Sequence, residues 1–146
     1  IRIPRFIVMR FIHEVPGHLV VQWDNSMKAI IDTWSVFSIS LEEFKEAVYQ
    51  KGLGYAKTNQ GHIWIVDALN AKGKLSSEIS DFIQQEGFEM KANGGIRYFI
   101  NIKPQSILRA VGVSYLSYTE TKFGMKIIEA SSVLEAKNWL RDQDLI

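Results

Sequence analysis

The chain contains no cysteine among its 146 residues, and it has only 3 prolines. The lack of cysteine excludes disulfides, thiolate metal ligands and cysteine nucleophiles. Long apolar runs are also missing, because none approaches the roughly 18–20 residues that span a bilayer. At the amino end Arg10 interrupts the apolar residues, and no small-residue cleavage site follows it. We therefore expect no integral membrane segment and a cytoplasmic protein.

The chain also lacks an excess of either charge, since positive and negative side chains nearly balance and the net charge is +1. Such a chain has no long-range field that attracts nucleic acid, so no nucleic-acid partner is expected. A hydrophobic content of 47% and a charged content of 23% are typical of a globular domain rather than a disordered one.

The length favours one domain, which we assign to residues 12–146. Residues 1–11 are interpreted as an extended arm or an edge strand. Phe6, Ile7, Val8 and Phe11 would leave an apolar edge in water if nothing covered them. This segment therefore predicts self-association as a homodimer.

Hydrophobic periodicity predicts alternating strands and helices. His18–Trp23 and Lys28–Trp34 read as a β-hairpin, because Asp24, Asn25 and Ser26 between them are turn residues. Further strands are expected at His62–Asp67, Ile96–Ile102 and Met125–Ala130. A capping box at Ser40–Glu43 opens a helix that Gly52 and Gly54 are expected to end. Other helices are expected to begin at Ser76 or Ser77, at Pro104 and at Ser132. This order predicts an α/β domain with a mixed sheet of about five strands.

The segment after the apolar strand Ile63–Val66 is the most informative for function. The strand ends at Asp67 and a polar loop leads to a helix, so these residues are expected at the carboxyl edge of the sheet, where α/β folds keep their sites. One interpretation is structural, with a loop-anchoring aspartate and an N-cap serine. The other is a phosphorylation or anion-binding site at a helix N-terminus. The candidate switch or binding loop comprises Asp67, Asn70, Lys72, Lys74, Ser76 and Ser77.

Motifs for catalysis, metals and cofactors are missing. His13, His18 and His62 show no metal-ligand spacing, and there is no G-x-S-x-G elbow, phosphate-binding loop or dinucleotide fingerprint. We therefore assign no catalytic residue, no metal and no cofactor. A triad assembled from distant residues stays open, because such triads have no fixed order in sequence.

Four stretches carry a resemblance to a known family: GHLVVQWDNSMKAIIDTW, SLEEFKEAV, HIWIVDALN and EASSVLEAKNWL. Over Phe11 to Arg141 the chain resembles the small bacterial STAS-like proteins, which are relatives of anti-sigma-factor antagonists and are grouped with CRAL-TRIO-type domains. The resemblance implies a curved sheet with helices mainly on one face, with an initial hairpin followed by alternating helix and strand. It also implies a phosphorylated serine after the central strand. Here that region runs from Asp67 to Ser77, with ALNAKGKL inserted between them.

The resemblance implies a non-enzymatic role. The first hypothesis is therefore a STAS-like regulatory or binding domain that recognises a protein partner or a small ligand. The second is a carrier of a lipid or another apolar ligand, and the third is a hydrolase with a dispersed site.

Overall fold

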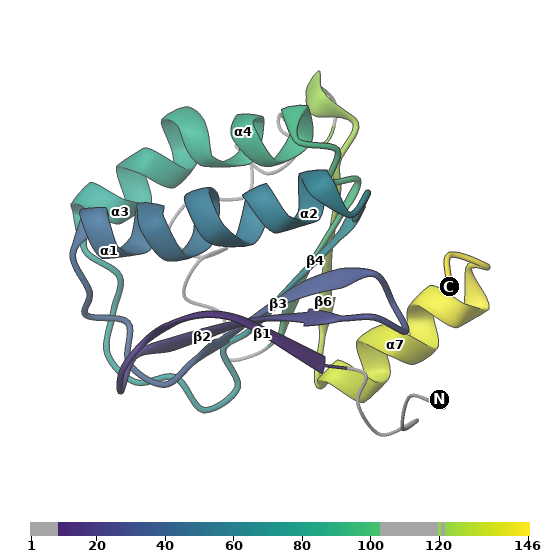
Figure 1. Ribbon diagram of the computed structural model, residues 1–146, viewed down its shortest axis with the longest axis horizontal. Coiled ribbons are helices and arrows are strands. Elements are labelled where there is room, and N and C mark those ends of the chain that lie inside the picture. Colours follow the sequence, from purple (N-terminus) through teal and green to yellow (C-terminus); the bar gives the residue numbers. More distant parts are fainter. Residues whose placement is uncertain (1–8, 103–119, 121) are drawn as a thin grey trace.

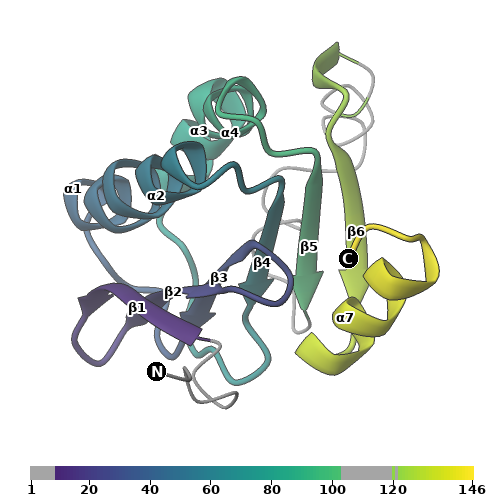
Figure 2. The same ribbon diagram turned by 45° about the vertical axis from the view of Figure 1, so that its right-hand side comes forward.

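A single six-stranded sheet organises the protein in the computed structural model, which describes residues 9–102, 120 and 122–146. Its strands lie in chain order: β1 (Met9–Val15), β2 (Leu19–Asp24), β3 (Ala29–Trp34), β4 (Ile63–Asp67), β5 (Tyr98–Ile102) and β6 (Lys126–Ala130). β1, β2 and β3 pair antiparallel, and β3 to β6 pair parallel (Figures 1 and 2). The α/β class and the mixed sheet are confirmed.

The sheet has six strands rather than about five, because β1 pairs with β2 from Met9 to Val15. β1 is an edge strand, and the side chain of Phe11 on it is 59% exposed. Residues 1–8 of the expected arm lie outside the described residues, as does the helix expected at Pro104. Homodimer formation through this edge stays a prediction.

The predicted hairpin is confirmed, and Asp24 shapes its turn. The Oδ1 atom of Asp24 accepts hydrogen bonds from the backbone N–H of Ser26 at 2.8 Å and of Met27 at 3.0 Å. The Ser26 hydroxyl donates to the same oxygen at 2.6 Å. Local side-chain bonds of this kind satisfy backbone donors that a turn would leave free.

Two long helical segments cover one face of the sheet (Figure 2). The first consists of α1 (Leu41–Phe44), the π-helical η1 (Lys45–Leu53) and α2 (Gly54–Thr58). The second consists of α3 (Ser77–Phe82), the π-helical η2 (Ile83–Gly87) and α4 (Phe88–Asn93). α7 (Val133–Asp142) packs on the opposite face. Among the helices that the structure describes, most therefore lie on one face, as expected.

The expectation that Gly52 and Gly54 end the first helix is wrong, since the helix continues to Thr58. Gly52 instead lets the helix approach the sheet, because a Cβ atom there would lie 3.0 Å from Cη2 of Trp64. Gly87 lets the two long helical segments approach each other, since a Cβ atom there would lie 2.5 Å from the hydroxyl of Tyr49 on η1. Close packing between elements outweighs the roughly 1 kcal/mol by which glycine weakens a helix.

β4 lies inside the sheet, between β3 and β5, and both of its faces are covered. Trp64 and Val66 belong to the core beneath the two long helical segments, whereas Ile63 and Ile65 belong to the core beneath α7. This explains the nearly continuous apolar run in sequence, because a strand buried on both faces needs apolar residues at every position.

Candidate functional site

The loop that joins β4 to α3 lies at the carboxyl edge of the parallel strands and holds the candidate residues. Asp67 ends β4 and is half-buried, and its Oδ1 atom accepts a hydrogen bond from the N–H of Leu69 at 3.2 Å. The N–H of Ala71 then donates to the carbonyl of Ala68 at 3.1 Å. Asp67 thus anchors the turn that starts the loop.

The middle of this loop is fixed to the segment that follows β3. The N–H of Lys72 donates to the carbonyl of Ser35 at 3.0 Å, and the N–H of Phe37 donates to the carbonyl of Lys72 at 2.9 Å. The two segments pair in parallel at Val36 and Lys72. The backbone of Lys72 is therefore held in place while its side chain stays exposed.

Ser76 caps α3. Its Oγ atom accepts a hydrogen bond from the N–H of Ile79 at 3.2 Å, and Ser77 is the first helical residue. The structural interpretation of Ser76 is confirmed, and the anion-binding role stays a prediction. Asn70, Lys74, Ser76 and Ser77 are all exposed. The loop therefore presents amide, ammonium and hydroxyl groups to solvent on a fixed backbone.

Asp67 and the serines share an edge of the sheet but not a face. Side chains along a strand alternate, so Asp67 shares the face of Ile63 and Ile65, which is the face covered by α7. α3 lies on the opposite face of the sheet. Among the residues that the structure describes, Asp67 and Ser76 each bond a backbone N–H of their own segment and not each other.

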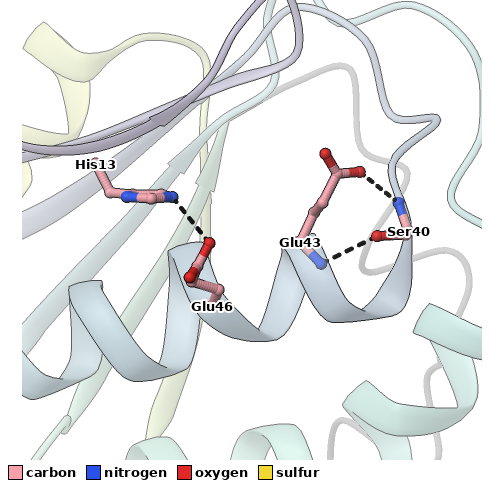
Figure 3. Close-up of polar contacts among 4 residues, drawn as sticks. All are labelled: His13, Ser40, Glu43 and Glu46. Carbon is pink, nitrogen blue, oxygen red and sulfur yellow. Dashed lines mark hydrogen bonds and ion pairs between the residues drawn. The ribbon is translucent and has the colours of Figure 1, made fainter.

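α1 begins at the same edge of the sheet as α3 (Figure 1). Its predicted capping box is confirmed: the N–H of Glu43 donates to Oγ of Ser40 at 3.0 Å, and the N–H of Ser40 donates to Oε1 of Glu43 at 3.1 Å. Figure 3 shows this box together with Glu46, which lies 3.6 Å from Nε2 of His13 on β1. The capping box satisfies backbone groups at the start of α1, and the contact between Glu46 and His13 links η1 to the edge strand β1.

Each of the three histidines contacts a different partner, which for His13 is Glu46. His18 Nδ1 lies 3.0 Å from the carbonyl of Pro16, and His62 Nδ1 lies 2.9 Å from the carbonyl of Gly95. Within residues 9–102 and 122–146 no hydrogen bond joins a serine to any of the three histidines, and no group of three acidic or histidine side chains is placed to hold a metal. The dispersed hydrolase site stays a prediction.

A buried polar cluster was not expected from the sequence. Asp32 on β3 is 2% exposed and Lys91 on α4 is 5% exposed. The indole N–H of Trp64 donates to Oδ2 of Asp32 at 2.9 Å. The ammonium of Lys91 lies over the rings of Trp64, Phe99 and Tyr49, at 4.6, 5.0 and 5.1 Å from their centroids. Cation–π attraction of this kind is strongest where water is excluded.

Burial shifts the protonation of these groups. It raises the pKa of Asp32 to about 6, although attraction to Lys91 and the Trp64 hydrogen bond oppose the shift. Burial lowers the pKa of Lys91 to about 8, and attraction to Asp32 opposes that shift. Burial and the charge of Asp32 also raise the pKa of Tyr49. Near neutral pH, Asp32 and Lys91 thus carry opposite charges inside the core.

Two sequence signals could have revealed the cluster. Asp32 is a lone acid within the strand AIIDTW, at a position whose neighbours on the same face, Ile30 and Trp34, are buried. Lys91 follows Phe88 by three residues and therefore lies on the apolar stripe of its helix. A charge on an apolar stripe in each of two elements is a pattern that predicts pairing between them.

Comparison of the chain with protein-family models, with curated proteins and with solved structures found no match. Within the part of the chain that the structure describes, no helix combines the length and the apolar character that crossing a membrane requires.

Proposed function

We propose that this chain is a STAS-like regulatory domain that binds a protein partner through the loop between β4 and α3. The observation that supports this role is the combination of a fixed backbone and exposed side chains in that loop. Hydrogen bonds at Asp67, Lys72 and Ser76 hold its start, middle and end. A preordered loop loses little conformational entropy when it binds, which favours recognition.

The chemistry of the loop suits a protein surface with an apolar patch and acidic groups. The side chain of Leu69 is 46% exposed, and Lys72 and Lys74 are exposed on the same loop. An exposed large apolar side chain on the same loop as two exposed cations resembles the apolar centre and polar rim of protein interfaces. The hydroxyls of Ser76 and Ser77 lie at the end of this surface.

Site-specific photo-crosslinking tests the proposal. A benzoylphenylalanine residue in place of Leu69 should form a covalent adduct with the partner in cells that express the chain. The matched control is the same residue in place of Leu134 on α7, whose side chain is 67% exposed. We expect an adduct from position 69 only, with a yield about tenfold lower when Lys72→Glu and Lys74→Glu are added. The same adducts from both positions, or none from position 69, would contradict the proposed surface.

A phosphorylation switch extends this proposal. Ser77 is exposed at the first turn of α3, whereas the Oγ atom of Ser76 already accepts the capping bond. A phosphate on Ser77 would be stabilised by the free N–H groups of the helix end and by Lys72 and Lys74. Phosphosite mapping of the chain after incubation with ATP and a lysate of its host is expected to find phosphate on Ser77. Ser77→Ala is the control, and an unmodified Ser77 would remove the switch.

A further inference from the structure

A row of basic residues lies at the amino edge of the parallel strands, opposite the loop discussed above. In the sheet register Ala29, Ile63, Tyr98 and Lys126 are neighbours. Lys28, His62 and Arg97 directly precede the first three of these residues. A basic residue therefore directly precedes each of β3, β4 and β5, a basic residue opens β6, and all four basic residues are exposed.

Hydrogen bonds fix this row. The carbonyl of His62 accepts from the N–H of Arg97 at 2.8 Å, and the carbonyl of Arg97 accepts from the N–H of Lys126 at 2.8 Å. Nη1 of Arg97 donates to the carbonyls of Ala92 and Ile96 at 3.0 and 3.1 Å. These two hydrogen bonds hold the guanidinium group beside the end of α4.

Two cavities open along the row, and His62 and Tyr98 line both of them. The first has a volume of about 360 Å³, and its apolar lining comes from Met27, Ile63, Tyr98, Leu145 and Ile146. Lys28 also lines it. A volume above about 300 Å³ is typical of small-molecule pockets.

The second cavity has a volume of about 390 Å³ and is lined by His62, Arg97, Tyr98, Gly124 and Lys126. Among the described residues that line either cavity there is no aspartate or glutamate. Glu120 comes near the row, and its Oε1 atom accepts a hydrogen bond from the N–H of Ile127 at 3.3 Å. The site thus places an apolar cavity beside a cationic one.

We propose that this amino-edge site binds a small organic anion with an apolar body. The apolar body occupies the first cavity, against Met27 and Ile63, and the anionic head lies beside Arg97 and Lys126 in the second. A carboxylate and a phosphate ester share this chemistry, because both accept charge-assisted hydrogen bonds from guanidinium and ammonium groups. The site lies at the other edge of the sheet from the proposed partner-binding loop, so the two proposals stand independently.

Calorimetric titration of the full chain with octanoate and with octyl phosphate, each below its micelle concentration, tests the site. We expect binding of at least one of the two anions, and their relative affinities show which head group the site prefers. Octylammonium carries the same tail with the opposite charge, and acetate and inorganic phosphate carry the heads without the tail. Each of these three is expected to bind at least about tenfold more weakly. Equal binding of octylammonium, or no binding of either anion, would overturn the proposal.

Variants then locate the site. Lys126→Gln is expected to weaken binding of the preferred anion about 5-fold, and adding Lys28→Gln should weaken it further. The control is Lys51→Gln with Lys57→Gln, which removes two exposed lysines outside either cavity. Amide chemical shifts should change at His62, Tyr98 and Leu145 on binding. Equal weakening by the control pair, or shift changes confined to other residues, would place the ligand elsewhere and refute this site.

Discussion

Replacing Lys91 with methionine is expected to lower the free energy of unfolding by about 3–5 kcal/mol, because it leaves the buried carboxylate of Asp32 without a compensating charge. Methionine has a volume similar to that of lysine and suits the three surrounding rings, so packing loss is a small part of the effect. Urea unfolding followed by tryptophan fluorescence measures the change.

The double variant Asp32→Asn with Lys91→Met is expected to recover most of that loss. Both charges are then absent, and the asparagine oxygen still accepts the hydrogen bond from the Trp64 indole. Removing two opposite buried charges together is often neutral or stabilising, so we expect the double variant within about 1 kcal/mol of the original chain. The coupling comes from a double-mutant cycle that includes Asp32→Asn alone. Additive losses across the cycle would show that the two residues act independently.

Stability is expected to depend on pH in two separate windows that originate in this cluster. The pKa of Asp32 is raised from 3.8 to about 6, so between these values the folded protein holds a proton that the unfolded chain has released. Stability therefore falls as the pH rises through that window. The pKa of Lys91 is lowered from 10.5 to about 8, so there the unfolded chain holds the extra proton. Stability therefore rises between about pH 8 and 10.5.

The contribution of Asp32 and Lys91 to the stability of the fold is thus smallest between about pH 6 and 8, where both side chains are charged. The pKa changes of Asp32 and Lys91 each correspond to a change of about 3 kcal/mol in the free energy of unfolding across the window. Subtracting the stability profile of the Asp32→Asn, Lys91→Met double variant removes the contribution of the surface groups, which both proteins share. We expect a trough near neutral pH in the difference profile. A flat difference profile would show that burial does not shift these two groups.

Local sequence signals were sufficient for most of the elements. The turn at Asp24, the capping box at Ser40 and the serine that begins α3 are confirmed, because each depends on side chains that bond backbone groups within a few residues. The apolar run Ile63–Val66 correctly indicated an interior strand. The prediction failed at Gly52, where a Cβ atom would lie 3.0 Å from the side chain of Trp64, a residue distant in sequence.

The position of the candidate loop was predictable from the sequence, but the relation between its residues was not. Asp67 and Ser76 lie at the same edge of the sheet because the loop from a parallel strand to the next helix runs there. Their separation onto two faces depends on the strand alternation and on which side α3 packs. The pattern of residues along the chain therefore predicts that the two residues share an edge of the sheet, but it does not predict that they lie on different faces.

The sequence by itself determined the α/β class, the alternation of elements and the serine caps, since short-range bonds and apolar periodicity produce them. Only the tertiary structure decided that Asp32 and Lys91 share one core and that Lys28, His62, Arg97 and Lys126 form one row. Asp32 and Lys91 are 59 positions apart in the sequence, and Lys28 and Lys126, the first and last residues of the row, are 98 positions apart. Their proximity arises from sheet register and helix packing, which depend on the whole fold at once.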